Sequence, residues 1–201
     1  ITGERDVYTF SAVPGQVIYM QDVSGTSVSG CGRPSWTLYG PDGATLKSDN
    51  LDGSDVGRIV LPTGPASPAN YTIAVKYCCT CENPVGTYSF KLYDVPAPVT
   101  YPIVAGVPVS EGTPAAGAGI LTVPGEQDLY TFSATAGEKI YFKSNGAAAP
   151  MTWTLTRPDA TEVFSVRLDD SDPGQKVLSQ TGTYTLTVKA AGNTVLNLGT
   201  Y

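Results

Sequence analysis

Two short acidic loops carry the side chains best suited to bind a metal ion. Their aspartates are Asp49, Asp52 and Asp55 in the first loop, and Asp169, Asp170 and Asp172 in the second. Calcium takes about six to eight oxygen ligands, which carboxylates and backbone carbonyls supply. The sequence therefore predicts calcium as the candidate cofactor. The spacing differs from that of an EF-hand, and aspartate beside Gly or Ser also forms ordinary turns, so both interpretations stay open.

The cysteines are the second group that could do chemistry, and all of them lie in the first half of the chain: Cys31, Cys78, Cys79 and Cys81. A bond between the adjacent Cys78 and Cys79 would be strained. We therefore favour Cys78–Cys81 together with Cys31–Cys79, although several pairings are possible. A zinc tetrathiolate is the alternative, for which three cysteines so close together are poorly spaced. Disulfides would place the protein in an oxidising compartment.

The sequence lacks the usual signs of catalysis and of nucleic-acid binding. It has no histidine, which removes the commonest general base. It also has no Gly-x-Ser-x-Gly, Ser-x-x-Lys or phosphate-loop motif, and repeated turn aspartates are weak support for a glycosidase. A net charge of −6 without a basic cluster excludes the electrostatic footprint of a nucleic-acid partner. We expect a protein that is not an enzyme, with no catalytic residues.

An internal repeat organises the chain. The segment Asp6–Ala12 recurs, with one substitution, as Asp128–Ala134, and Trp36-Thr-Leu38 recurs as Trp153-Thr-Leu155. Apolar and polar residues alternate through these segments, which is typical of half-buried antiparallel strands. Turn signals such as Pro14-Gly15 separate them, as in β-sandwiches.

These patterns predict an all-β protein of two tandem antiparallel β-sandwich domains. The predicted boundaries are 1–95 for the first repeat, 96–118 for a Pro/Gly-rich linker and 119–201 for the second repeat. The apolar runs are far shorter than the ~20 residues that a membrane-spanning helix needs, so no membrane span is expected.

The tyrosines fall into two sets. Those at repeated positions are expected to face the core: Tyr8, Tyr71, Tyr88, Tyr130, Tyr184 and Tyr201. Those without an aromatic counterpart in the other repeat are expected to be exposed: Tyr39, Tyr77, Tyr93 and Tyr101. Exposed aromatic rings stack on sugars, so Tyr39, Tyr77 and Tyr93 are the candidate ligand-binding residues. Trp36 and Trp153 alternate with Thr and are expected in the cores.

The two repeats differ at their ends. Gly86-Thr-Tyr88 leads into the alternating segment Ser89–Val95, whereas its counterpart, Gly199-Thr-Tyr201, has no such continuation in this sequence. The last strand of the second repeat is therefore expected to be missing. Either the sequence is a window on a longer multi-repeat protein, or a strand from another molecule completes the sheet in a head-to-tail assembly.

Several short motifs resemble those of the bacterial pre-peptidase C-terminal domain family. They are Asp6–Phe10, Trp36–Gly43 and Leu61–Val75 in the first repeat, with Asp128–Phe132, Trp153–Asp159 and Gly182–Val188 in the second. The resemblance implies a jelly-roll-like β-sandwich of secreted or surface proteins, some of which bind collagen, polysaccharide or calcium. The longer, Pro-rich linker and the absence of a peptidase domain depart from the family pattern, so an accessory role to a protease is not assigned.

Together these features favour an extracellular or cell-surface structural repeat or stalk of a bacterial protein. Its expected partners are copies of itself or neighbouring repeats of a longer chain, with self-assembly into a filament through strand complementation. The alternative function is a carbohydrate-binding or matrix-binding module, dependent on calcium, whose partner is a polysaccharide or matrix protein.

Overall fold

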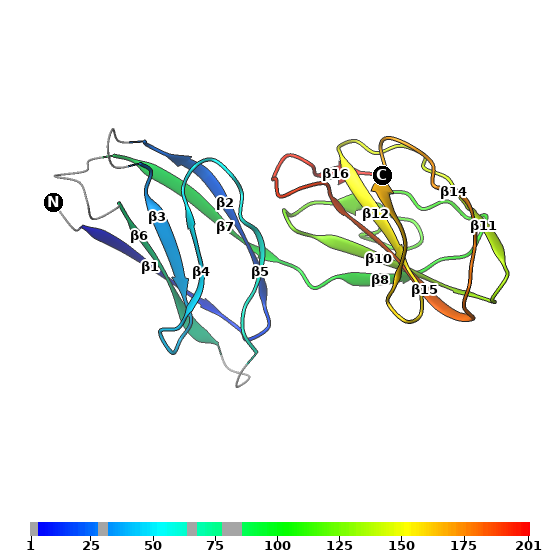
Figure 1. The fold of residues 1–201 in the computed structure, drawn as a ribbon, viewed down its shortest axis with the longest axis horizontal. Coiled ribbons are helices and arrows are strands. Elements are labelled where there is room, and N and C mark those ends of the chain that lie inside the picture. The colour runs from blue at the N-terminus through cyan, green and yellow to red at the C-terminus, as the bar shows by residue number, and fades with distance from the viewer. Residues whose placement is uncertain (1–3, 28–31, 64–67, 78–85) are drawn as a thin grey trace. The chain divides into compact units, whose positions relative to one another are not determined.

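A computed structural model describes residues 4–27, 32–63, 68–77 and 86–201, and these residues divide into two compact units, Ile1–Val95 and Pro96–Tyr201. Within the described ranges every regular element is a β-strand, and none is a helix (Figure 1). In that part of the chain there is accordingly no helix long and apolar enough to cross a membrane. The prediction of an all-β protein with antiparallel sheets is confirmed.

Unit 1 contains two antiparallel sheets. The strands are β1 (Arg5–Ala12), β2 (Val17–Gly25), β3 (Ser35–Tyr39), β4 (Thr45–Asn50), β5 (Gly57–Val60), β6 (Ala69–Lys76) and β7 (Tyr88–Val95). One sheet has the order β1-β6-β3-β4 and the other β5-β2-β7. Side chains from both sheets, among them Met20, Leu38 and Ile73, share one core, so the unit is sandwich-like.

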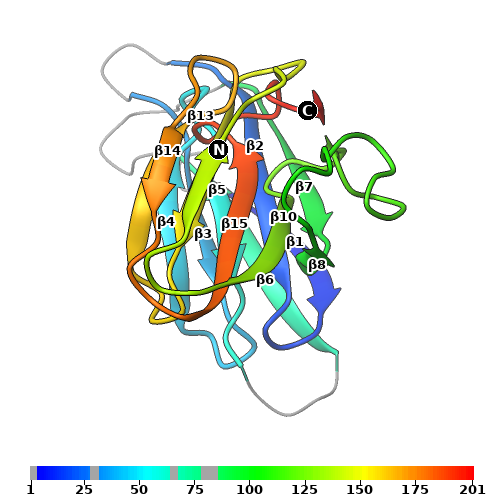
Figure 2. The same cartoon turned by 90° about the vertical axis from the view of Figure 1, so that its right-hand side faces the viewer.

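Unit 2 contains a larger sheet and two strand pairs. Its strands are β8 (Val99–Pro102), β9 (Ile120–Leu121), β10 (Gln127–Ala134), β11 (Lys139–Phe142), β12 (Met151–Thr156), β13 (Glu162–Arg167), β14 (Gly174–Val177), β15 (Gly182–Ala190) and β16 (Gly199–Thr200). The five-stranded sheet has the order β13-β12-β15-β10-β8, in which β8 and β10 are parallel. Figure 2 labels β15, β10 and β8 in this order. The pairs β11-β14 and β16-β9 are antiparallel.

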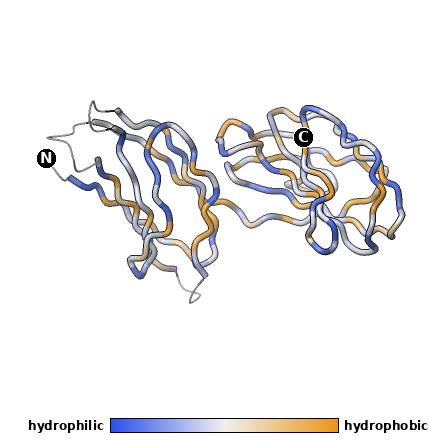
Figure 3. Tube along the Cα trace, in the orientation of Figure 1, coloured by the Kyte–Doolittle hydropathy of each residue, from blue (hydrophilic) through white to orange (hydrophobic). Residues whose placement is uncertain are grey.

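The repeated sequences form the same strands with the same register. Asp6 lies opposite Val75 and Tyr8 opposite Ile73 in unit 1, just as Asp128 lies opposite Val188 and Tyr130 opposite Leu186 in unit 2. Figure 3 shows the hydropathy along the chain, with hydrophobic and hydrophilic stretches following one another through the strands of both units. Because successive side chains of a strand point to opposite faces, the alternation of apolar and polar residues fixes which face is buried and therefore fixes the register.

The tryptophans lie where the alternation predicts. Trp36 is 1% exposed and Trp153 is 5% exposed, each within the core of its own unit. The expectation that they are core residues is confirmed, and a role as exposed ligand platforms is not available to them.

A difference at one sheet edge overturns two expectations about tyrosines. In unit 2, β8 pairs with β10 along the edge away from β15, and Tyr101 is buried with its ring stacked on Tyr130, 5.5 Å between centroids. The prediction that Tyr101 is exposed is therefore wrong. On the corresponding edge of unit 1 no described strand covers β1, and Tyr8 is 43% exposed, although it was expected to be in the core.

Candidate functional site

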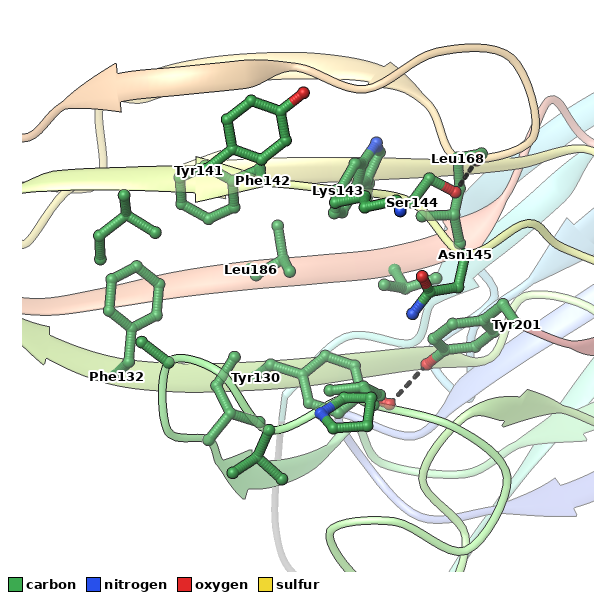
Figure 4. A pocket seen from close by; sticks show the side chains of 18 of the residues that line it. Tyr130, Phe132, Tyr141, Phe142, Lys143, Ser144, Asn145, Leu168, Leu186 and Tyr201 are labelled. Atoms are coloured by element: carbon green, nitrogen blue, oxygen red, sulfur yellow. Dashed lines mark hydrogen bonds between the residues drawn. The ribbon is translucent and has the colours of Figure 1, made fainter.

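Unit 2 has an open groove along one edge of β11. A cavity of about 200 Å³ lies between β11 with its continuation to Gly146, on one side, and β10 with the loop 103–109, on the other. We name this cavity the acceptor groove. Figure 4 shows Phe142 on the side of β11, Tyr130 and Phe132 on the side of β10, and Leu186 of β15 between them.

Unit 1 shows which element occupies the equivalent position. There β2 pairs with β5 over Val17–Met20, and it pairs with β7 on its other edge from Val17 to Gly25. In unit 2, β11 pairs with β14 over the matching four residues, and in the described chain no strand pairs with its other edge. The acceptor groove is therefore the place that β7 takes in unit 1.

The length of β11 reflects the difference. β2 continues as a strand to Gly25, whereas β11 ends at Phe142. The additional residues of β2 are paired with β7 alone. Since a strand is maintained by hydrogen bonds to a neighbour, residues 143–147 lack the partner that would keep them extended, and they are not in a strand.

Residues of the core of unit 2 line the groove. Trp153 and Leu186 are buried core residues, and the half-buried Phe132 and Ile140 pack against that core. Three apolar side chains at the groove are strongly exposed: Val104 is 70%, Val107 56% and Tyr141 62% exposed. An apolar cavity of roughly 150 Å³ is large enough for a benzene-sized guest. The acceptor groove is therefore large enough for one or two apolar side chains.

A buried polar cluster closes one end of the groove. The Tyr201 hydroxyl donates to Asp128 Oδ2 at 2.5 Å and lies 2.7 Å from the Tyr130 hydroxyl, which in turn accepts from the Gly119 amide. Asp128 is 2% exposed. Burial raises the pKa of its carboxyl above the ordinary value, while the hydrogen bonds from Tyr201 and Tyr130 lower it in part. Burial also raises the pKa of Tyr130 to about 12.

Unit 1 contains the same cluster in a different setting. Tyr88 donates to Asp6 Oδ2 at 2.5 Å and lies 2.7 Å from the Tyr8 hydroxyl. Asp6 is exposed. Tyr88 is the first residue of β7, so Tyr201, its counterpart, marks where an equivalent strand would enter the acceptor groove. In Figure 4 Tyr201 lies at one end of the groove and Phe132 toward the other.

The aspartates of the first acidic loop form local hydrogen bonds. Asp55 accepts from the Tyr19 hydroxyl at 3.0 Å and from the Asp22 amide at 3.1 Å. Asp52 accepts from the Ser54 amide and Asp49 from the Asn50 amide, both at 2.9 Å. The contacts of Asp55 connect the loop to β2, and those of Asp52 and Asp49 are local contacts with residues nearby in the chain.

Asp22 is a buried carboxylate that the sequence did not single out. It is 4% exposed, and its Oδ2 accepts from the Gly53 amide at 2.6 Å, while its Oδ1 has no hydrogen-bond partner among the described residues. Burial raises the pKa of its carboxyl, and the backbone amides of Gly53 and Asp52 lower it in part. Its counterpart in the repeat is the neutral Ser144. The signal that could have identified Asp22 is its alternation with Ile18 and Met20, which places it on the core-facing side of the strand.

The second acidic loop is arranged in a similar way. Asp172 accepts from the Ser144 amide at 2.7 Å, the bond that corresponds to Asp55 with Asp22. Asp169 pairs with the Arg167 guanidinium, which lowers the pKa of that carboxyl. Asp170 is exposed. Among the residues that the structure describes, no three side chains of His, Cys, Asp or Glu gather closely enough to hold a metal ion.

The three candidate ligand-binding tyrosines lie apart, and each makes contacts of its own. Tyr39 is on β3 with the Arg5 guanidinium 5.2 Å from its ring centroid. Tyr93 is on β7, in the other sheet, and donates to Gln21 Oε1 at 2.9 Å. Tyr77 donates to the Thr26 carbonyl at 3.0 Å. All three are half-buried, and Tyr39 and Tyr93 are on different sheets, so they do not form a single platform.

The predicted disulfides cannot be placed, because Cys31, Cys78, Cys79 and Cys81 all lie outside the described residues. No protein-family model matches the sequence, and a comparison with curated proteins gives no match either. The acceptor groove and the Asp128 cluster are therefore interpreted from their own geometry.

Proposed function

We propose that the protein is a non-catalytic, extracellular structural repeat of a bacterial surface assembly, and that a β-strand from a neighbouring repeat or molecule completes unit 2. The acceptor groove is the observation that supports this most directly, since unit 1 holds β7 where unit 2 has an open groove lined by apolar side chains. Addition of a strand would pair the free edge of β11 and cover apolar surface in one step.

The alternation within β7 indicates how an added strand stabilises the unit. In unit 1, Tyr88, Phe90 and Leu92 pack against the core from alternate positions. Fully burying a side chain of the size of Leu or Phe contributes about 1.5–3 kcal/mol, and this must exceed the entropy lost when the strand becomes ordered. A strand without apolar residues at these positions would not offset that cost.

A chain extended at its C-terminus tests the proposal. The sequence of Ser89–Val95 is added directly after Tyr201, in the order in which it follows Tyr88. We expect slower amide hydrogen exchange in β11 and residues 143–147 and a higher Tm of unit 2, because each 1 kcal/mol raises the Tm of a domain of this size by about 4–8 °C.

The matched control carries the same extension with Ser at the positions of Phe90 and Leu92. It keeps the length and the backbone donors but not the buried side chains, and we expect neither protection nor a rise in Tm. Equal exchange rates in the unextended, extended and control chains would show that the groove does not accept a strand, and the proposed function would be abandoned.

A further inference from the structure

The side chains of β11 and of Lys143, along the acceptor groove, favour some partner strands over others. This inference rests on the function proposed above. In unit 1, β7 is antiparallel to β2, with Lys91 opposite Gln21, Leu92 opposite Met20 and Tyr93 opposite Tyr19. Met20 pairs with Gly57 on its other side, as Phe142 pairs with Gly174. These pairs show that Met20 of β2 corresponds to Phe142 of β11. A strand that pairs with β11 as β7 pairs with β2 would therefore place the position of Leu92 opposite Phe142.

The positions of β11 that face away from the core bear positive charge. Lys139 and Lys143 are both exposed, and in the register of β7 they lie opposite the positions of Val95 and Lys91. Opposite charges on directly paired residues of an antiparallel sheet stabilise it, and like charges destabilise it. A strand with the sequence of β7 would therefore bring Lys91 against Lys143.

An aromatic side chain is favoured between these two positions. In unit 1, Tyr19 and Tyr93 are cross-strand neighbours, with ring centroids 6.4 Å apart and a T-shaped arrangement. Tyr141, the counterpart of Tyr19, is 62% exposed. Such a pair is worth more than its buried area alone, so a partner strand with an aromatic residue at the position of Tyr93 would cover Tyr141.

The opposite face of the partner strand must be apolar. Phe142 is 8% exposed and contacts the core, and in unit 1 the residue paired with its counterpart is Leu92. Phe90, two residues earlier, also packs against the core of unit 1. The groove is lined by aromatic and aliphatic side chains, which fit apolar residues at both of these positions.

We infer that the acceptor groove binds an extended strand, antiparallel to β11, that reads apolar–acidic–apolar–aromatic at the positions of Phe90 to Tyr93, with a second acidic residue opposite Lys139. The partner is therefore a strand whose outward charge is complementary to β11. The β7 strand of a second copy has the apolar and aromatic residues but the wrong charge opposite Lys143.

Lys139 and Lys143 thus determine which strands can pair with the open edge of β11. Lysine on an edge strand discourages pairing with unrelated strands, and at Lys143 it disfavours the chain's own β7 in particular. An acidic residue in the partner converts the same side chain into an attractive contact, so one residue excludes one strand and accepts another.

Two fluorescently labelled peptides test this inference on the full chain. One has the sequence Tyr88–Val95, and the other has the same sequence with Lys91→Glu. Their dissociation constants are compared by fluorescence anisotropy at low salt and at high salt. We expect the Lys91→Glu peptide to bind about fivefold more tightly at low salt, from the change of one cross-strand pair from repulsion to attraction, and the difference to shrink at high salt.

Two chain variants locate the effect. Lys143→Glu should reverse the preference, so that the unaltered β7 peptide becomes the tighter ligand. Lys189→Glu changes the net charge equally but lies on β15, in the other sheet, and should leave the preference unchanged. The inference is overturned if both peptides bind equally, or if Lys189→Glu alters the preference as much as Lys143→Glu does.

The failure of this inference can be separated from failure of the proposed function. Binding of both peptides with equal affinity, together with stabilisation by the C-terminal extension, would leave strand addition in place and remove only the charge selectivity. If neither peptide binds and the extension gives no protection, the groove does not receive strands, and the lysines serve only to keep the edge unpaired.

Discussion

Replacing Tyr201 by Phe should destabilise unit 2 far more than replacing Tyr88 by Phe destabilises unit 1. Each hydroxyl donates at 2.5 Å to an aspartate of the same repeated motif and contacts a second tyrosine at 2.7 Å. The hydrogen-bond geometry is thus the same, but Asp128 is 2% exposed and Asp6 is exposed. The comparison isolates the effect of burial on one hydrogen bond.

The expected loss in the free energy of unfolding depends on which hydrogen-bond donors remain for each aspartate once the tyrosine hydroxyl is removed. Water can replace the Tyr88 hydroxyl at Asp6, so we expect a loss of about 0.5 kcal/mol in the free energy of unfolding. Asp128 would keep the Tyr130 hydroxyl at 3.4 Å, which is a weak bond. A hydrogen bond to a buried charged group contributes about 1.5–3 kcal/mol, and we expect a loss of about 2 kcal/mol for Tyr201→Phe at pH 7.

The effect should also depend on pH in a defined direction. Burial raises the pKa of Asp128 in the folded protein. A group with a raised pKa contributes stability below its unfolded pKa of about 3.9, and this is lost as the pH rises through the folded pKa. The Tyr201 bond limits that loss, because it stabilises the carboxylate. The destabilisation by Tyr201→Phe should therefore be largest at pH 7 and should diminish toward pH 4.

Hydrogen exchange measured on the intact chain reports the two units separately, through peptides of β6 in unit 1 and β15 in unit 2. Exchange is followed at increasing urea and corrected for the intrinsic rate at each pH. Equal losses for the two variants would refute the argument from burial. A Tyr201→Phe effect that grows as the pH falls would show that the hydroxyl does not stabilise the ionised form of Asp128.

Two further predictions concern the acidic loops. Asp172→Ala removes the acceptor of the Ser144 amide and should lower the stability of unit 2 by about 1 kcal/mol in urea unfolding, whereas the exposed Asp170→Ala should change it little; equal effects would contradict the role of Asp172. Calcium at about 5 mM should leave the Tm unchanged relative to EDTA, because among the described residues no three carboxylates of these loops gather closely enough to hold a metal ion; a rise in Tm would show that calcium binds the native state.

The fold could be predicted largely from the alternation of side chains, because a period of two fixes both the strand and its buried face. The segment Asp6–Ala12 and its repeat form β1 and β10 with identical registers, and both tryptophans are buried as their alternation with Thr indicates. The local pattern was sufficient for the register of β1 and β10 because each pairs along its whole length with a neighbour in its own sheet.

Edges were harder to predict, since the neighbour of an edge strand is not encoded in that strand. Tyr8 and Tyr130 have almost the same local sequence, yet one is 43% exposed and the other 1%. The difference comes from β8, a short strand in the segment expected to be a linker, which pairs with β10 in parallel. A segment of four strand residues rich in Pro and Val carries too little periodicity to predict that pairing.

The sequence indicated that a strand was missing from unit 2 but did not indicate where the open edge would lie. The missing counterpart of Ser89–Val95 could not show which strand would lack a neighbour; β15 is paired on both edges, whereas β11 is paired with β14 alone and the groove lies along its other edge. Lys139, Tyr141 and Lys143 could not be singled out, because their significance depends on which residues of a partner strand lie opposite them. That information is present only in the β2–β7 register of unit 1.

The differences between the repeats indicate why the open edge is at β11 and not at β2. β2 bears Gln21 and the buried Asp22 where β11 has Lys143 and Ser144, and Asp22 is held by the Gly53 amide within the same unit. β2 is thus fitted to a strand from its own unit, with uncharged Gln21 opposite Lys91. β11 has kept the apolar face, since Ile140 and Phe142 match Ile18 and Met20, but it bears lysine on the outward face. Retention of these apolar positions, together with the changes at Gln21 and Asp22, is what a site for a different strand requires, whereas an edge that simply remained unpaired would favour loss of the apolar positions as well.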